Sequence, residues 1–397
     1  MKDAAAIFAY LRTHAPPPYM CWRSPEGALR LAAGTESRDF PSQETEWRAW
    51  LRGQFAFDAG NTIPRLFIMA FDPSERQDGV WDGFPSAEIW RPSMMYTAED
   101  GVERFHGLDA DAFPDEGAGA ASGGAFPRHG GIRVAFDDVE EYRGRVQAGL
   151  AQLREGALEK IVLARSVRVE LASSFDPLQA LSALQLPHSF GICYSPDGER
   201  FFLSATPERL ARVQDGTFST MALAGTMTRD RTGDGGHEAL LADAKERAEH
   251  AYVTEMIRGA LAPFSRAMRV DDVRLLTLPH ITHILTHIEG QLSEGHGMLD
   301  VVSALHPTPA VAGTPRDEAT AGIRLLEDFS RGLYAGCVGW VDDAGNGDAA
   351  VTIRSAVVHN HAARAFAGAG IVAGSDPADE EAETRAKLQT VLDVLGA

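Results

Sequence analysis

Cysteine is scarce in this chain, which contains only Cys21, Cys193 and Cys337. The three are far apart in the sequence, show no C-x-x-C spacing and are odd in number, so we expect neither a zinc site nor a disulfide framework. This cysteine usage indicates a reducing compartment. The apolar run Ala4 to Leu11 is too short to span a membrane. Asp3 and the lack of a small-residue cleavage site argue against a signal peptide. We therefore expect a cytoplasmic protein.

Positive charge is also in short supply. The 397 residues carry a formal net charge of −19, which argues against nucleic acid and anionic membranes as partners because both require basic surface. An anionic substrate would have to be received by local cations or by a metal ion. Hydrophobic residues make up 44% of the chain, enough for a large core. Its length allows either several domains or one large domain.

Lysine is the third scarce residue. Only Lys2, Lys160, Lys245 and Lys387 are lysines, against 33 arginines. Unlike arginine, a desolvated lysine can lose its proton, so each remaining lysine is a candidate for such a role. Lys2 lies at the terminus, and we assign it no such role. The other three lysines lie beside or within the sequence motifs described below.

The order of hydrophobic runs predicts an α+β fold with mostly antiparallel sheets, because strand meanders are interrupted by helices without regular βαβ alternation. Residues 113–131 form a Gly/Ala/Ser/Pro tract that indicates a surface loop. We expect helices at about 138–155, 177–185, 237–262 and 376–395. We expect strands at 65–72, 160–171, 189–195, 199–205, 208–214, 335–342, 348–358 and 364–374.

The last predicted helix carries an unusual stripe. Glu380, Glu383 and Lys387 fall within about 60° of one another on a helix, and Val391 and Val394 continue the same face. One interpretation is a solvated surface helix with a Glu383–Lys387 pair. Because the stripe becomes apolar one turn later, the carboxylates could instead lie at the mouth of a buried site.

The helix predicted at 237–262 repeats this pattern. Glu246 and Glu249 are three residues apart, and Val253, Ile257 and Ala260 continue their face. Four carboxylates meeting in a partly buried place would repel one another unless a cation lay between them. Oxygen-only ligands favour Mg²⁺ over Zn²⁺, while two unrelated solvated helices remain the alternative.

Several longer motifs occur together and in one order. They are "EKIVLARSV", "SATPERL", "LAGT", "KERAEH", "LHPTPAVAGTPRDEA", "GCVGWVD", "AVTIRSAV" and "AGAGIVAGSDPADEEAETRAKLQTVL". Over about residues 135–397 the chain resembles the chorismate-utilising enzymes, which include isochorismate synthases, salicylate synthases and the large subunits of anthranilate and aminodeoxychorismate synthases. The resemblance implies one large domain over 1–397 with two antiparallel sheets between outer helical layers. Within it we expect a divergent part at 1–112, a Gly-rich loop at 113–131 and a catalytic core at 132–397.

The resemblance also implies roles for the acidic helices. Glu249 and Glu383 match direct Mg²⁺ ligands, and Glu246 and Glu380 match the outer pair that holds metal-bound water. No organic cofactor is implied. The implied substrate-binding positions are Lys387 and Arg354 for a carboxylate, Tyr334 and Gly368 beside it, Gly225 and Thr226 along the ring, and His283, for which His287 is an alternative.

Lys160 and Glu208 match the catalytic pair. Lys160 would activate water, which requires burial to lower its pKa, and Glu208 would protonate the departing ring hydroxyl, which requires a raised pKa. Without the resemblance, Lys160 could be a strand-edge lysine paired with Glu159. Glu208 could likewise be a surface residue in the turn after Pro207.

Lysine at position 160 resembles the members that add water, whereas ammonia-using members typically have glutamine there. Ala224 in "LAGT" stands where aminodeoxychorismate enzymes carry a nucleophilic lysine. We therefore expect an isochorismate synthase that acts on chorismate, as a monomer and without a glutaminase subunit. A salicylate synthase, which goes on to eliminate pyruvate, is the main alternative. An aminating synthase and a catalytically silent binding protein are less favoured. The pathway served, for a siderophore, menaquinone or salicylate, stays open.

Overall fold

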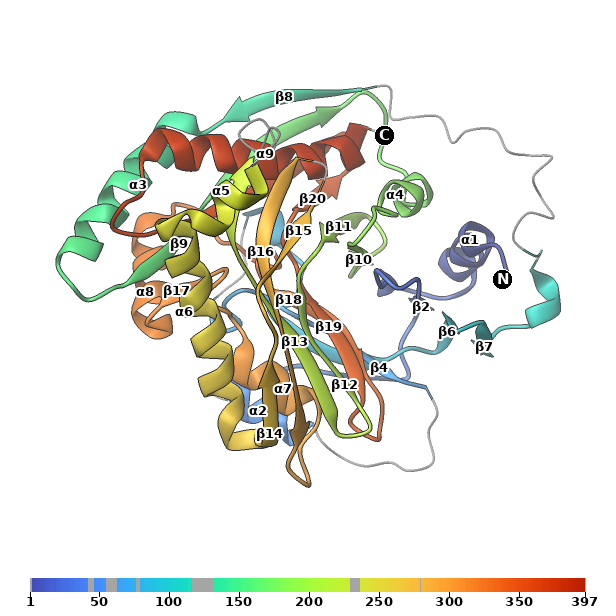
Figure 1. Cartoon of the computed structure of the whole chain (residues 1–397). Coiled ribbons are helices and arrows are strands. Elements are labelled where there is room, and N and C mark those ends of the chain that lie inside the picture. Colours follow the sequence, from blue (N-terminus) through green and yellow to red (C-terminus); the bar gives the residue numbers. More distant parts are fainter. Residues whose placement is uncertain are drawn as a thin grey trace.

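The fold is seen in a computed structural model (Figure 1) that describes residues 2–41, 46–54, 63–75, 79–113, 115, 131–228, 236–278 and 280–396. Most of the Gly-rich tract predicted as a loop at 113–131 lies outside these ranges, as does the side chain of Lys245.

The first sheet contains the strand that begins at Lys160, and all its described pairings are antiparallel. In spatial order its strands are β17 (Gly313–Thr314), β9 (Lys160–Leu171), β21 (Ala362–Ile371), β20 (Ser355–His359), β11 (Arg200–Thr206), β10 (Phe190–Ser195), β1 (Tyr19–Arg23), β2 (Leu29–Ala33), β6 (Met94–Glu99) and β7 (Val102–His106), with β8 (Ile132–Asp137) pairing with β9.

The second sheet is also antiparallel in every described pairing. Its order is β14 (Ser265–Val270), β16 (Ile281–Leu292), β13 (Thr217–Thr228), β12 (Arg209–Gln214), β19 (Gly347–Val351), β18 (Cys337–Val341), β4 (Arg65–Met69), β5 (Ala87–Arg91) and β3 (Ser37–Asp39), with β15 (Arg274–Thr277) pairing with β16. Strands from the first 112 residues thus extend both sheets, since β1 pairs with β10 and β4 with β18.

Helices lie on the outside of the two sheets (Figure 1). The α-helices are α1 (Ala4–His14), α2 (Trp47–Gly53), α3 (Val139–Arg154), α4 (Pro177–Ala183), α5 (Gly236–Ala242), α6 (Ala244–Leu261), α7 (Met298–Leu305), α8 (Arg316–Leu326) and α9 (Pro377–Gly396). Short 3₁₀ turns are η1 (Gly79–Trp81), η2 (Ala110–Ala112) and η5 (Ala262–Phe264). Helix α9 packs on β21 beside α3, and α6 packs on β13. The predicted α+β class with two antiparallel sheets and outer helices is confirmed.

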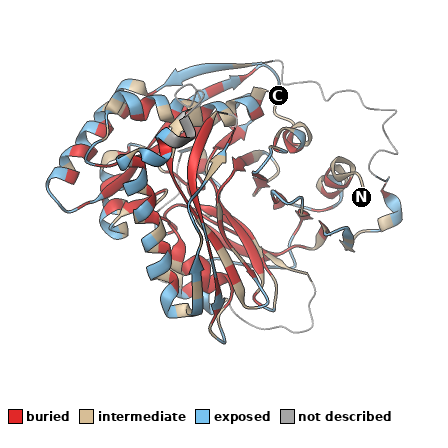
Figure 2. Cartoon of the chain, viewed as in Figure 1, coloured by how far each residue is buried: buried red, intermediate tan, exposed pale blue. Residues whose placement is uncertain are grey.

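Two clusters of buried apolar side chains hold these layers together. The larger one joins the sheets, with Phe202 and Phe366 from the first and Phe67 and Val338 from the second. The smaller one lies on the other side of the first sheet, where α1, α4 and α9 cover it; Leu388 of α9 is one of its members. Figure 2 shows the result, with buried residues along the strands and exposed ones on the outer helix faces.

Two predicted elements are interrupted. The helix expected at 237–262 is two helices, because Asp243 ends α5 and its side chain accepts a hydrogen bond from the backbone N–H of Glu246 (3.2 Å), as a cap of α6 does. The strand expected at 348–358 is also two. Residues 352–354 carry the chain from β19 in the second sheet to β20 in the first, and Arg354 has a positive φ of 51°.

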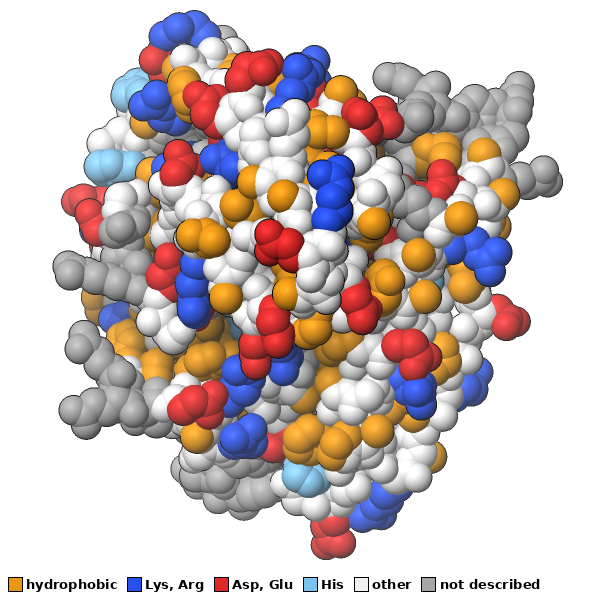
Figure 3. Space-filling view, turned by 90° about the vertical axis from the view of Figure 1, so that its left-hand side faces the viewer, with side chains coloured by type: hydrophobic (Ala, Val, Ile, Leu, Met, Phe, Trp, Pro, Cys, Tyr) orange, Lys and Arg blue, Asp and Glu red, His pale blue; other side chains and the backbone are white. Residues whose placement is uncertain are grey.

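The surface mixes charges of both signs. On the face shown in Figure 3, acidic and basic side chains are interspersed with hydrophobic ones. Within the described ranges, no helix has the length and apolar character needed to cross a membrane.

Candidate active site

A small pocket lies where β21 extends past its neighbour. Strand β20 pairs only with residues 362–366 of β21, whereas β9 pairs with β21 as far as Ile371. The crossover at residues 352–354 faces the edge that β20 leaves uncovered, and together these segments border a cavity of about 40 Å³. Its lining is Val162, Glu208, Leu223, Ala224, Thr226, Glu249, His283, Ala310, Val311, Tyr334, Ile353, Arg354, Ala367, Gly368, Gly370 and Lys387.

Arg354 and His283 form one wall of this pocket. The guanidinium of Arg354 lies 3.1 Å from Nε2 of His283, and Nδ1 of His283 lies 2.9 Å from Oγ1 of Thr226. Because arginine can only donate, Nε2 accepts and the ring proton belongs on Nδ1, which donates to Thr226. Burial, together with the charges of Arg354 and Lys387, holds the pKa of His283 well below its usual range. The imidazole is therefore neutral, and the positive charge of this wall comes from arginine.

Glu208 lies in the short link between β11 and β12, and it is only 4% exposed. Burial raises its pKa to about 7, although the nearby charges of Arg354, Lys160 and Lys387 act in the opposite direction. A carboxyl group in this state can give up a proton near neutral pH. The surface-turn alternative for Glu208 is therefore wrong.

Lys160 begins β9 with a fully buried side chain. Its Nζ donates to Oε1 of Glu249 on α6 at 2.9 Å, so the alternative pairing with Glu159 is wrong. A Cβ added to Gly370 would lie 2.5 Å from Oε1 of Glu249 and 2.8 Å from Cε of Lys160. Glycine at position 370 thus makes room for this ion pair, of which Glu249 lines the pocket.

Lys387 approaches from the other side, on α9. Its Nζ lies 2.6 Å from Oε1 of Glu383 and donates to the carbonyl of Gly368 at 2.9 Å, on the edge of β21 that β20 leaves uncovered. Side-chain exposure is 11% for Lys387 and 15% for Glu383, so this predicted pair exists but is largely buried. Tyr334 closes the same corner, since its hydroxyl would be 2.8 Å from a Cβ at position 368.

The outer carboxylates are buried as well, which excludes the interpretation of two solvated helices. Glu246 is 7% exposed, and its Oε2 accepts a hydrogen bond from the backbone N–H of Thr226 at 2.6 Å. This contact holds a bulge in β13, at residues 223–226, where Gly225 has a φ of 81°. Glu380 is 1% exposed, and its charge helps to raise the pKa of Tyr142 on α3 after the larger effect of burial.

Most of the predicted site residues therefore meet at one place. Glu208, Thr226, Glu249, His283, Tyr334, Arg354, Gly368 and Lys387 line the pocket. Lys160 and Glu383 each contact a lining residue, while Gly225, Glu246 and Glu380 lie outside the lining. The choice between the two histidines is also resolved, because His287 is exposed on β16.

Donor chemistry at the pocket fits Mg²⁺ better than a softer metal. Among the described residues, no three His, Cys, Asp or Glu side chains are grouped closely enough to bind one ion. Mg²⁺ usually takes one or two carboxylates directly and keeps several waters. Glu249 and Glu383 could hold it in that manner, with Glu246 and Glu380 behind them, provided that their lysine partners move.

Sequence reasoning missed part of the lining. Two of these residues, Ala310 and Val311, lie in the quoted motif "LHPTPAVAGTPRDEA" without an assigned role, and Gly370 lies two residues after the assigned Gly368. The other missed residues are Val162, Leu223, Ala224, Ile353 and Ala367.

The fold and pocket together define a two-sheet α+β protein with a small pocket to which Arg354 and Lys387 contribute positive charge. Residues 131–396 match the family described as "chorismate binding enzyme", and the chain belongs to this family. It is 34% identical to the salicylate biosynthesis isochorismate synthase of Pseudomonas aeruginosa, over 96% of this chain and 85% of that protein.

Two further similar proteins are also described as isochorismate synthases. The isochorismate synthase MenF of Bacillus subtilis is 33% identical over 82% of this chain and 73% of its own length. The structure of the menaquinone-specific isochorismate synthase MenF from Escherichia coli superposes with a TM-score of 0.78 at 25% identity, covering 99% of this chain and 92% of that one.

Proposed function

We propose that this protein is an isochorismate synthase, an enzyme that interconverts chorismate and isochorismate in the presence of Mg²⁺. The observation that carries the proposal is a pocket that presents Glu208, whose pKa burial raises to about 7, together with Arg354 and Lys387, while the fully buried Lys160 contacts the lining residue Glu249. The relatives named above support the same activity.

The chain's own residues supply an acid and a base. Lys160 would accept a proton from the water that attacks carbon 2 of the ring, the ring double bonds would shift, and Glu208 would donate a proton to the hydroxyl that leaves carbon 4 as water. In the reverse direction Lys160 and Glu208 exchange these roles. The reaction consumes one water and releases one, so no oxidant or organic cofactor is needed.

Local positive charge at the pocket explains how so acidic a protein could bind a dianionic substrate. Arg354 is 5% exposed, and burial lowers its pKa to about 10, so it remains a cation at neutral pH. Lys387 faces the same cavity. These two side chains would bind the carboxylates of the substrate and orient its ring between Lys160 and Glu208.

The two glutamates proposed to bind Mg²⁺ are each paired with a lysine in this structure. Lys160 donates to Glu249 and Lys387 to Glu383, and an ammonium group held by a carboxylate cannot serve as a base. When bound, Mg²⁺ would neutralise a substrate carboxylate and give both glutamates another partner. Released from Glu249, Lys160 could lose its own proton to solvent and then take one from the attacking water, while Lys387 could bind the substrate.

A product assay tests the proposal. Purified protein is incubated with chorismate, with and without Mg²⁺, and the products are identified by chromatography and mass spectrometry. We expect a mixture of chorismate and isochorismate that requires Mg²⁺ and is absent with Lys160→Ala. Salicylate and pyruvate above the spontaneous background would identify a salicylate synthase instead. No turnover of chorismate would refute both activities.

Three other expectations remain part of the proposal: cytoplasmic location, a monomeric enzyme and one domain with a divergent N-terminal part. The relatives' names include salicylate biosynthesis and menaquinone-specific enzymes, and the genes beside this one would distinguish such pathways. Light scattering of the purified protein would test the monomer.

A further inference from the structure

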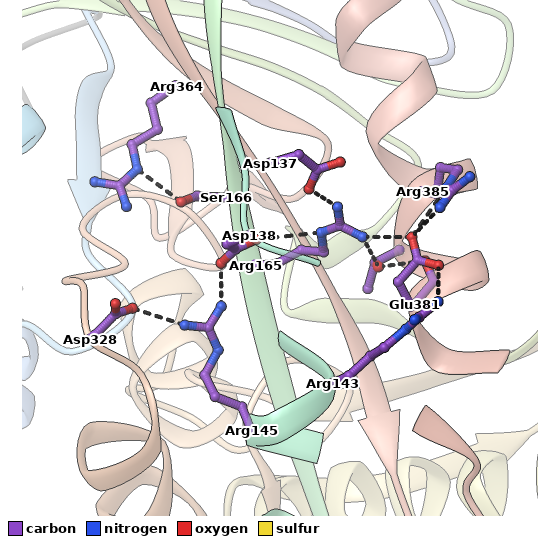
Figure 4. Close-up of polar contacts among 11 residues, drawn as sticks. Asp137, Asp138, Arg143, Arg145, Arg165, Ser166, Asp328, Arg364, Glu381 and Arg385 are labelled. Carbon is purple, nitrogen blue, oxygen red and sulfur yellow. Dashed lines mark hydrogen bonds and ion pairs between the residues drawn. The ribbon is translucent and has the colours of Figure 1, made fainter. Parts of the chain in front are cut away.

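A charge network centred on the buried Arg165 joins β8, β9 and α9 (Figure 4). Arg165 is on β9, the strand that begins with Lys160, and its side chain is fully buried. One guanidinium nitrogen donates to Oε1 of Glu381 on α9 at 2.9 Å, and another donates to Asp137. Its Nε lies 3.5 Å from Oδ1 of Asp138. Arg165 therefore connects the strand of the proposed base to the helix that carries Glu383 and Lys387.

Three arginines from three elements hold Glu381. Besides Arg165, Arg385 of α9 lies 2.8 Å and Arg143 of α3 lies 3.4 Å from its carboxylate oxygens. The side chain of Glu381 is only 4% exposed. It directly follows Glu380 in the sequence, on the side of α9 that faces α3 and β9, so its position fixes how α9 is turned about its own axis.

Rotation of α9 matters because Lys387 reaches the pocket from the surface of this helix, with Glu383 paired to it. Side chains extend the radius of a helix to about 5–6 Å, so turning α9 by about 30° would move Glu383 and Lys387 by roughly 3 Å. Even about 1 Å of misplacement in an active site can reduce catalysis by about 100-fold. Lys387 binds the free edge of β21 at Gly368, and Glu381 provides a second, independent attachment near the start of the helix.

We propose that Arg165 is a positioning residue: through Glu381 it sets the rotation of α9, and with it the placement of Glu383 and Lys387 relative to Lys160. The inference rests on the proposed function of the pocket. Arg165 itself does not touch the substrate. Its role is to fix the position of the residues on α9 relative to those on β9.

Arg145 offers a matched control in the same network. Its side chain is 8% exposed and is paired with Asp138 and Asp328, neither of which lies on α9. Replacing Arg145 by methionine removes a buried arginine close to Arg165 but leaves Glu381 with its partners. Comparing the Arg165→Met and Arg145→Met variants therefore distinguishes a general loss of stability from a loss of α9 positioning.

The test compares Arg165→Met, Arg165→Lys and Glu381→Gln with Arg145→Met in the full chain. The melting temperature, the dissociation constant of Mg²⁺ by calorimetry, and kcat and KM for chorismate are measured for each. Arg165→Met and Glu381→Gln should weaken Mg²⁺ binding at least tenfold and lower kcat. Arg145→Met should lower the melting temperature without either effect, and Arg165→Lys should restore part of the Mg²⁺ affinity.

The outcomes separate this inference from the proposed function. If the wild type binds Mg²⁺ and turns over chorismate but the Arg165 and Glu381 variants match Arg145→Met in Mg²⁺ affinity, the positioning role is refuted. If the wild type does not turn over chorismate, the proposed function fails, while the Mg²⁺ titrations still test the positioning. Should Arg165→Met not fold, Glu381→Gln, which keeps the shape of the side chain, decides the question.

Discussion

Replacing Glu208 by glutamine should remove a loss of stability that the wild type suffers as the pH rises to neutrality, and it should also slow catalysis. Burial raises the pKa of Glu208 from its ordinary 4.5 to about 7. A group whose pKa is raised by folding contributes stability below its unfolded pKa, and this contribution is lost as the pH rises through the folded pKa. The folded protein therefore loses stability from Glu208 between about pH 4.5 and pH 7, and glutamine at this position has no such loss.

The size of the effect follows from the same values. A change in pKa from 4.5 to about 7, at roughly 1.4 kcal/mol per pKa unit, corresponds to about 3 kcal/mol in the free energy of unfolding. We expect the stability difference between Glu208→Gln and the wild type to grow by about this amount from pH 4.5 to pH 8. Turnover of chorismate should fall by about 10²- to 10⁴-fold, as expected for loss of a general acid.

Urea denaturation at a series of pH values measures the difference, and groups that titrate equally in both proteins cancel. Glu318→Gln serves as the control, since Glu318 lies exposed on α8 and the same atoms are exchanged. A stability difference for Glu208→Gln that stays flat between about pH 4.5 and pH 8 would refute the reasoning. Glu208 would then be ionised at neutral pH and could not act as the proton donor.

Three further substitutions test individual contacts. Lys160→Arg can keep the ion pair with Glu249 but cannot lose a proton, so kcat should fall by about 10²-fold or more, and steady-state assays that find near-normal kcat would contradict the role of base. Arg354→Met should raise the KM for chorismate by about 10- to 100-fold, in line with the roughly 1.5–3 kcal/mol of a hydrogen bond to a charged group, and should change kcat less. Gly370→Ala should lower kcat strongly, because the added methyl would lie 2.5 Å from Glu249, whereas Gly374→Ala, which meets nothing within 4 Å, should match the wild type.

The sequence predicted the larger elements because their side-chain periodicity reflects burial. Residues 160–171 and α9 follow the expected bounds closely, and each has a long apolar face. The crossover at Arg354 could not be predicted in this way. Residues 348–358 form one continuous run of strand-forming residues, and only the packing of two separate sheets decides that the chain leaves one and enters the other there.

In the acidic helices, the sequence also failed to predict the burial of one particular residue. The spacing of Glu246 and Glu249, and of Glu380 and Glu383, left two interpretations open, a shared cation site or two solvated helices. It gave no sign that Glu381 is also buried, because neighbours in a helix normally point about 100° apart and one of them reaches solvent. Helix α9 lies against both β21 and α3, so two of its faces are covered, and a buried acid on the second face was indistinguishable in the sequence from a surface charge.

Lysine usage is informative because arginine and lysine do different work in this molecule. Buried arginines such as Arg165 and Arg331 direct several donors at once into fixed networks of carboxylates and carbonyls. The lysines at the pocket are different, since each pairs one compact ammonium group with one glutamate, and one member of each pair lines the cavity. An arginine at position 160 could not give up its proton. In a chain that otherwise relies on arginine, we infer that Lys160 and Lys387 occupy positions where a compact ammonium group serves better than a guanidinium group.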